Sequence, residues 1–306
     1  MDDRSGLTLR GALDKFLSSS RCVNPNTRRG YAATLDKLAD GIGANRPLAS
    51  IAPDELAAAL EDLWGQAAPA TWNQRRAATA SFLAWCAKNS HPAPELPASL
   101  ERRPEHADET KAIPHAAIER LLTRRDIPLR EKTLWRMLYE TAARAGEILA
   151  LNIEDLDLDA HRATVVSKGG AIEYVYWATG TARLLPRLIA DRTHGPLFLS
   201  HRRPAPARRP PARDLCPDSG RARLGYDRAR VLLDQHTSPG DGLPGWDLHQ
   251  WRHSAATTLG EKNTSLQLIM AKTRHRNPRT VMRYIKPGAE AVTEVTGLLD
   301  VTPPRR

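Results

Sequence analysis

The chain has 306 residues, a formal net charge of +10, 41% hydrophobic residues and only 5% aromatic residues. This length suffices for two domains of ordinary size. No stretch approaches the roughly 18 uncharged apolar residues of a membrane span, and the first residues are acidic where a signal peptide is basic. We therefore expect a cytoplasmic protein without membrane contact. The charge favours nucleic acid as partner, the alternative being an unspecific basic surface.

Three cysteines, Cys22, Cys86 and Cys216, lie far apart in the chain and match no CxxC spacing. They suit a reducing compartment and offer neither a disulfide framework nor a zinc cluster. We expect all three to be structural.

The first 90 residues form the first expected domain. Apolar residues at helical spacing predict four helices, over 9–17, 27–40, 53–64 and 71–88, which would pack as a compact bundle. Asn24 before Pro25 is a typical helix start, because its side chain can cap free backbone amides. This domain is nearly neutral, with 11 basic and 9 acidic residues, but it carries two arginine pairs. The pairs are solvated faces or phosphate contacts: Arg28 with Arg29, and Arg75 with Arg76.

Residues 91–110 contain four prolines and few apolar residues, which predicts an extended linker. A second domain, 111–306, is expected to be mainly helical. Two short β patterns, 161–167 and 171–177, flank a Gly-Gly pair and predict a small antiparallel hairpin. Residues 201–230 hold nine arginines, three aspartates and five prolines, so we expect an insertion or mobile loop that buries little.

Two cationic residues of the second domain stand in places that suggest a ligand. Arg144 lies between two apolar helices, where its permanent charge needs an anionic partner. That partner is either a buried carboxylate, such as Glu147, or a bound anion. Lys168 lies at the expected hairpin tip, where it is either solvated or able to reach into a ligand groove.

His249, Arg252 and His253 occur at helical spacing i, i+3 and i+4, so their side chains share one face. Two histidines at i and i+4 also occur in zinc proteases. The Glu that acts as general base there is replaced by Gln250, and an arginine on the same face would repel a dication. The pattern favours an anionic oxygen over a metal.

His275 and Tyr284 lie in a basic segment without an acidic residue between Lys272 and Lys286. Nearby cations would stabilise a phenolate at Tyr284. Taken alone, a tyrosine with apolar neighbours is more often part of a core.

The order Arg, Lys, His-x-x-Arg, His, Tyr resembles the tyrosine recombinase (phage integrase) family. The family's T-G-x-R-x-x-E-L-x-x-L is similar to TAARAGEILAL at 141–151. Its H-x-L-R-H-T-x-A-T-x-L resembles HQWRHSAATTL at 249–259, and its L-G-H with Tyr nine residues later resembles His275 and Tyr284. The family also has a hairpin lysine, and a helical SAM-like core-binding domain that the first 90 residues resemble. Three departures stand out: Ala142 for Gly, Thr273-Arg274 for Leu-Gly, and the 201–230 insertion.

The resemblance implies a site-specific recombinase that cleaves and rejoins double-stranded DNA through a 3′-phosphotyrosine, without metal, cofactor or ATP. It implies a homotetramer in the synaptic complex, a monomer free in solution, and a C-terminal helix around 289–301 that docks on a neighbouring subunit. Tyr284 would be the nucleophile, Lys168 the acid for the leaving oxygen, and His249 an aid to proton transfer. Charge on the phosphate would be stabilised by Arg144, Arg252 and His275. DNA contacts are expected from Arg28, Arg29, Arg75, Arg76, Arg274 and Arg276.

Three alternatives stay open at this point. A type IB topoisomerase would use the same chemistry as a monomer with little sequence preference. A catalytically silent DNA-binding regulator requires a lost catalytic group, whereas all six are present in the sequence. A zinc hydrolase fits least well.

Overall fold

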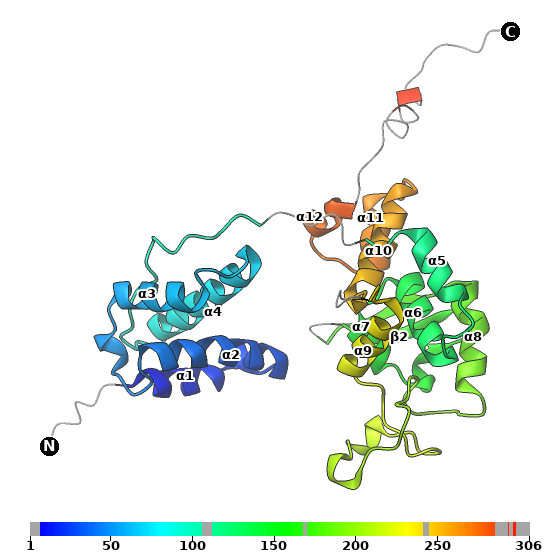
Figure 1. Ribbon diagram of the computed structural model, residues 1–306, viewed down its shortest axis with the longest axis horizontal. Coiled ribbons are helices and arrows are strands. Elements are labelled where there is room, and N and C mark those ends of the chain that lie inside the picture. Colours follow the sequence, from blue (N-terminus) through cyan, green and yellow to red (C-terminus); the bar gives the residue numbers. More distant parts are fainter. Residues whose placement is uncertain are drawn as a thin grey trace. The chain divides into compact units, whose positions relative to one another are not determined.

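The computed structural model describes residues 7–105, 112–167, 170–240, 245–284 and the single positions 293, 296 and 297. The chain divides into two compact units, Met1–Ala107 and Asp108–Arg306 (Figure 1). Both units are mainly helical, and the second contains a small antiparallel sheet. The expected fold class is confirmed. The expected C-terminal helix lies almost entirely outside the described residues.

The first unit contains the four expected helices, and their ends follow local sequence signals. Asn24 accepts bonds from two backbone N–H groups at the start of the second helix, where Pro25 occupies the first position. The other long helices also begin at prolines, Pro53 and Pro69. The helices are α1 (Leu9–Leu17), α2 (Pro25–Ile42), α3 (Pro53–Trp64) and α4 (Pro69–Lys88).

Aromatic packing holds the first unit together. Phe16 of α1 is fully buried, and its ring meets Phe82 of α4 edge-on, with centroids 5.6 Å apart. It meets Tyr31 of α2 in the same way at 5.1 Å. Cys22 and Cys86 are free thiols buried in the same core. Burial raises the pKa of the Cys86 thiol to about 11, which keeps it unreactive at neutral pH.

The segment expected as a linker packs on the first unit as far as residue 105. Leu100 is buried in the core. The indole of Trp72 donates to the carbonyl of Glu101 (2.8 Å), and the guanidinium of Arg103 lies 4.1 Å from the centre of the same ring. The proline-rich composition therefore excludes helix here but does not prevent packing.

In the second unit, helices surround α6, which packs against α8 and α10 (Figure 1). Trp135 of α6 and Trp251 of α10 are fully buried and stacked, with centroids 6.4 Å apart. The hairpin strands pair in register with Val165 opposite Glu173, and a short strand extends the sheet to three. The first elements are α5 (His115–Thr123), α6 (Leu129–Thr141), α7 (Ala145–Ala150), β1 (Leu156–Asp157), β2 (Arg162–Val166) and β3 (Ile172–Tyr176). Then follow α8 (Thr179–Ile189), α9 (Tyr226–Thr237), α10 (Leu248–Glu261), α11 (Leu266–Thr273), α12 (Pro278–Val281) and a 3₁₀ turn, η7 (Met282–Tyr284).

The arginine-rich segment 201–230 is anchored to this unit, although few of its residues are buried. Cys216 and Leu224 are buried, and α9 already begins at Tyr226. The guanidinium of Arg223 donates to the carbonyls of Ala150 (2.8 Å) and Leu151 (2.9 Å) at the end of α7, where the helix leaves carbonyls without intrahelical partners. The rest of the segment, yellow-green in Figure 1, extends beyond the helices. Within the described part of the chain, no helix is both long and apolar enough to cross a membrane.

Candidate active site

Arg144 stands at the junction of α6 and α7, held by one carboxylate. Its Nη1 lies 2.8 Å from Oε1 of Glu147, and its backbone N–H donates to Oε2 of the same residue (3.0 Å). The Glu147 side chain is buried, whereas the Arg144 side chain is nearly half exposed. Since a guanidinium has five N–H donors, this pairing orients Arg144 and leaves other donors that could meet an anion.

Arg252 of α10 is the most deeply buried cation of the site, with only 2% of its surface exposed. Its Nη1 donates to the carbonyl of Ala142 (2.8 Å), and its Nη2 lies 3.1 Å from Nε2 of His275. Burial, followed by repulsion from Arg144 and Arg274, lowers the pKa of Arg252 to about 10. Arg252 therefore stays protonated at neutral pH. A bound anion would offset the repulsion that its charge experiences from the neighbouring arginines.

His275 follows α11 and faces Arg252. Burial, then repulsion from Arg252 and Arg144, lowers its pKa to about 4, so the ring is neutral at neutral pH. Because a guanidinium can only donate, we infer that Nε2 of His275 accepts from Arg252. Nδ1 then carries the proton and donates a hydrogen bond to Oγ1 of Thr273 (2.7 Å).

Tyr284 ends the 3₁₀ turn η7 beside these groups. Its ring meets His253 of α10 edge-on at 4.7 Å between centroids and lies 6.3 Å from the ring of His275. It packs on a small apolar cluster that contains Ile269 of α11. The charge of a Tyr284 phenolate would raise the pKa of Arg252, which places the phenol within electrostatic reach of that guanidinium.

The structure gives less detail on the two remaining predicted catalytic residues, His249 and Lys168. His249 is exposed in the first turn of α10, and its positive form would lower the pKa of His275. Lys168 lies outside the described residues. In sequence it falls between β2 and β3, whose strands form the expected hairpin. The catalytic roles of both residues stay predictions.

The site is rich in cations. Arg144, Arg252 and Arg274 all influence the pKa of His275 by repulsion. No group of three or more His, Cys, Asp or Glu residues able to hold a metal ion is found in the described parts of the chain. The donors present suit an anionic oxygen, such as that of a phosphate.

The two arginines beside His275 differ in environment. Arg274 is buried, and its guanidinium pairs with Glu147 and with Glu173 of β3. Arg276 is exposed. The sequence predicts that both contact DNA, yet of the two only Arg276 has an exposed side chain. The pairing of Arg274 had no signal in the sequence, because its two partners lie 127 and 101 positions earlier in the chain.

The predicted arginines of the first unit also divide into two kinds. Arg28 and Arg29 are exposed at the start of α2. Arg75 is partly buried and donates to Oγ1 of Thr34 (2.7 Å), and Arg76 donates to the carbonyl of Leu100. The second pair thus also serves the folding of the unit.

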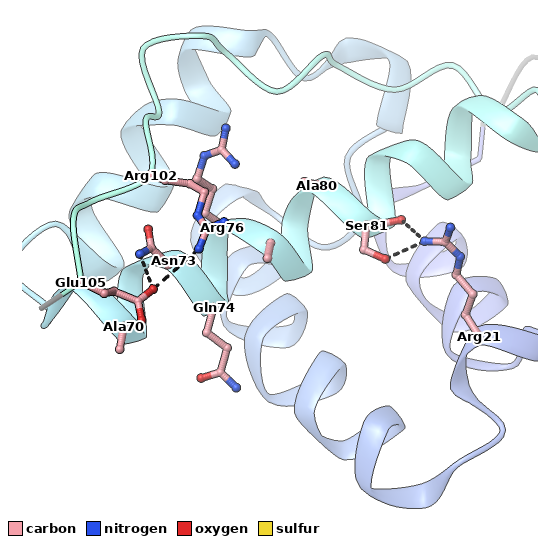
Figure 2. A pocket seen from close by; sticks show the side chains of 10 residues that line it. Arg21, Ala70, Asn73, Gln74, Arg76, Ala80, Ser81, Arg102 and Glu105 are labelled. Atoms are coloured by element: carbon pink, nitrogen blue, oxygen red, sulfur yellow. Dashed lines mark hydrogen bonds and ion pairs between the residues drawn. The ribbon is translucent and has the colours of Figure 1, made fainter. Parts of the chain in front are cut away.

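A hollow along one face of α4 carries more basic than acidic side chains. At one end Arg21 donates to Oγ of Ser81 (2.7 Å), and at the other Asn73 donates to Oε1 of Glu105 (2.6 Å), with Gln74 between them (Figure 2). Sequence reasoning missed this surface, because its residues come from three separate segments. Its lining includes three arginines: Arg21, Arg76 and Arg102.

Comparisons with known proteins identify the family. A sequence profile described as the phage integrase family matches residues 107–290. Tyrosine recombinase XerC of Mycobacterium sp. (strain JLS) is 26% identical over 285 residues, which span 89% of this chain and 92% of that protein. XerC of Mycobacterium tuberculosis (strain CDC 1551 / Oshkosh) is 28% identical over 284 residues, spanning 89% and 91%.

Solved structures of low sequence identity share the fold. A lambda integrase tetramer bound to a Holliday junction matches with a TM-score of 0.70 at 16% identity, over 93% of this chain and 78% of that one. The Tn1549 transposon integrase in complex with transposon right end DNA matches with a TM-score of 0.71 at 12% identity, over 95% and 99%. Since the family profile covers more than half of the sequence and includes all the residues of the site, the chain belongs to the phage integrase family and is a tyrosine site-specific recombinase that acts on DNA.

Proposed function

We propose that the protein cleaves and rejoins DNA at two specific sites through a covalent bond between Tyr284 and a 3′ phosphate. The observation that carries this proposal is the gathering of the Tyr284 ring, His275 and the buried guanidinium of Arg252 in one place. A tyrosine beside neutral histidine and permanent cations suits attack on a phosphodiester, which is itself an anion.

In the proposed step, the Tyr284 oxygen loses its proton and forms a bond to phosphorus, while the bond from phosphorus to the 5′ oxygen breaks. Lys168 gives a proton to that departing oxygen, and His249 assists proton transfer at Tyr284. Rejoining is the reverse reaction with a new 5′-hydroxyl. The tyrosyl ester conserves the phosphodiester bond, so the scheme needs no ATP.

Arg144 and Arg252 donate to the non-bridging oxygens, where negative charge grows in the transition state. Each such preorganised donor commonly contributes about 10²–10³ in rate. In the free protein Arg252 donates to Nε2 of His275. A phosphate would take over that donor and offset the repulsion that lowers the pKa of His275. The imidazole could then turn from acceptor to donor toward the phosphate.

DNA is held, in this proposal, by exposed cations outside the site. Arg28, Arg29 and Arg276 are open side chains that can meet phosphates. The hollow along α4 adds Gln74, whose amide could read base edges. Exchange between two sites requires four cleavable strands, hence a homotetramer assembled on DNA from free monomers. The lambda integrase of similar fold is a tetramer on a Holliday junction.

A nicked suicide substrate in EDTA tests the covalent step, because loss of a short strand beyond the nick prevents rejoining. The parent protein should form an adduct linked to the 3′ phosphate. Tyr284→Phe should bind the same DNA and form no adduct, since the ring stays and the nucleophile is lost. Tyr226→Phe is the matched control, an exposed tyrosine of α9 that should leave adduct formation intact.

Two outcomes would change the assignment. An adduct with Tyr284→Phe would show that another residue is the nucleophile. Relaxation of supercoiled plasmid DNA that lacks a recombination site, without any recombinant product, would favour a type IB topoisomerase.

A further inference from the structure

Arg274 occupies a backbone position that the family pattern gives to glycine. It is the C-cap of α11 and has left-handed backbone angles, φ 55° and ψ 40°. Side chains disfavour this conformation, whereas glycine adopts it readily. The Arg274 side chain is also 93% buried, since only 7% of it is exposed. A strained backbone and a buried charge both need compensation from specific contacts.

Those contacts are two carboxylates that belong to the site. Nη2 of Arg274 pairs with Oε2 of Glu147, and its Nε lies 3.1 Å from a carboxylate oxygen of Glu173. Glu147 also pairs through Oε1 with Arg144 at 2.8 Å. The buried carboxylate of Glu147 is therefore shared between two guanidiniums, of which Arg144 is the more exposed.

The charge balance of this cluster depends on Arg274. Three guanidiniums and two carboxylates lie in this cluster, which leaves an excess of one positive charge among them. Without Arg274 the formal excess is zero, and Glu147 would attract Arg144 alone. Glu147 would then compete with a phosphate for Arg144, and the site would attract an anion less strongly. The cluster consists of Arg144, Arg252, Arg274, Glu147 and Glu173.

Arg274 also connects the end of α11 to the β2–β3 hairpin. Glu173 lies on β3, and the neighbouring Lys272 donates from Nζ to the carbonyl of Tyr176 at the end of that strand (2.7 Å). The end of α11, just before His275, is thus bound to β3 through two contacts, one from Arg274 and one from Lys272. In the sequence, this hairpin carries Lys168 between its strands.

We propose that Arg274 is a positioning residue, which neutralises Glu147 so that Arg144 stays available to the scissile phosphate and which fixes the β2–β3 hairpin against α11. The inference rests on the proposed function. It assigns to Arg274 a role different from the DNA contact that the sequence suggests. Arg276 lies two residues further along the chain and is exposed. It therefore serves as the comparison, an arginine expected to contact DNA.

Three variants separate positioning from DNA contact: Arg274→Gly, Arg274→Lys and Arg276→Gly. Glycine suits the left-handed backbone at 274, so Arg274→Gly removes the side chain without adding strain. We expect Arg274→Gly to slow adduct formation at saturating DNA by about 10–100-fold while leaving the Kd and its salt dependence within two-fold. Arg274→Lys, which keeps the charge, should recover part of the rate. Arg276→Gly should weaken binding and reduce its salt dependence.

A double variant distinguishes charge balance from general damage to the structure. Glu147→Gln removes one negative charge and keeps an oxygen that can accept the backbone N–H of Arg144. Added to Arg274→Gly, it should restore part of the lost cleavage rate. A further loss in the double variant would refute the charge-balance role. A rate equal to the parent in Arg274→Gly, or a loss of affinity like that of Arg276→Gly, would overturn the proposal.

The titration of His275 provides a readout that does not require cleavage. The groups that act on its ring are Arg252 and His249 of α10, Arg144 before α7, Tyr284, and the adjacent Arg274. Removing the Arg274 charge should raise the pKa of His275 above its value of about 4, and Arg274→Lys should leave it closer to the parent. NMR titration of the imidazole measures this. If the parent protein forms no adduct, the proposed function fails, whereas an unchanged His275 titration counts against the role of Arg274 alone.

Discussion

Exposed arginines of the helical first unit and buried arginines of the catalytic unit use the same side chain in opposite ways. In the first unit, Arg28 and Arg29 stand exposed on the first turns of α2. In the catalytic unit, Arg252 is 2% exposed and Arg274 has only 7% of its side chain exposed. An exposed guanidinium in water interacts weakly and is screened by salt. A buried one loses hydration, and the fold tolerates it only with fixed partners.

This difference teaches what each arginine can contribute. Exposed arginines can add to DNA affinity one by one, with a strong salt dependence. Buried arginines cannot move to meet a distant phosphate, but they present donors in a fixed geometry with little screening, which is what a transition state requires. Affinity should therefore respond to substitution of exposed arginines in either unit, and rate to substitution of the buried arginines of the catalytic unit.

The largest effect is expected at Lys168, and it tests whether the catalytic unit also supplies a proton. Lys168→Ala should slow cleavage of an ordinary substrate by about 10²–10⁴. A bridging 5′-sulfur makes the leaving group far less basic, so the same variant should cleave that substrate nearly as well as the parent. Arg144→Ala should stay slow on both substrates, as measured by single-turnover adduct formation. Without rescue by sulfur, Lys168 would be assigned to DNA contact.

Arg252→Lys tests the fixed geometry of the buried cation. A lysine ammonium keeps the charge but cannot hold the Ala142 carbonyl and a phosphate oxygen with one planar group. Cleavage at saturating DNA should fall by about 10²–10³, while the Kd measured by fluorescence anisotropy stays within about two-fold. A loss of affinity as large as the loss of rate would contradict the division between exposed and buried arginines.

A stability measurement tests the buried histidine. His275 has its pKa lowered to about 4, from a usual value of about 6.5. Between these values the unfolded chain binds more protons than the folded one. The contribution of His275 to the free energy of unfolding is therefore fully present above about pH 6.5 and is lost as the pH falls toward 4. Each kcal/mol lost should lower the Tm of the catalytic unit by about 2–4 °C. Calorimetry from pH 7 to 4 should show a smaller drop for His275→Asn, and equal drops would mean that His275 does not contribute.

The arginine-rich segment is an exposed charge surface within the catalytic unit. Replacing Arg202, Arg208, Arg209 and Arg213 by Gln should reduce the slope of log K against log salt by up to about 3.6, since each phosphate contact contributes about 0.9. The saturated cleavage rate should not change. Arg223→Gln is the matched control, because it removes the anchor to α7 and should lower the Tm instead. An identical salt slope in the four-site variant would place the segment off the DNA.

The smallest effect is expected for the exposed pair of the first unit. Arg28→Gln combined with Arg29→Gln should reduce the salt slope by about 1.8 at most and leave cleavage of bound DNA unchanged. Arg75→Gln, whose parent side chain donates to Thr34, should reduce thermal stability more than the salt slope. A slowed cleavage of bound DNA in the Arg28 and Arg29 variant would mean that the first unit also acts on the chemical step.

Local patterns in the sequence determined the elements and most of the site. Helical spacing and the caps at Asn24 and the prolines set the helices of the first unit, because these signals act within one or two turns. The hairpin followed from two β patterns around a Gly-Gly pair. The motif spacing selected Arg252, His275 and Tyr284, which the fold then brings together.

Only the tertiary structure decided how charges far apart in the chain are partnered. Arg274 lies 127 positions from Glu147, and Arg223 lies 73 positions from Ala150, so neither pairing leaves a local pattern. For the same reason the sequence missed the hollow along α4 and the inward contacts of Arg75 and Arg76. Periodicity depends on neighbours along the chain, whereas burial of a guanidinium depends on where distant carboxylates and carbonyls lie after folding.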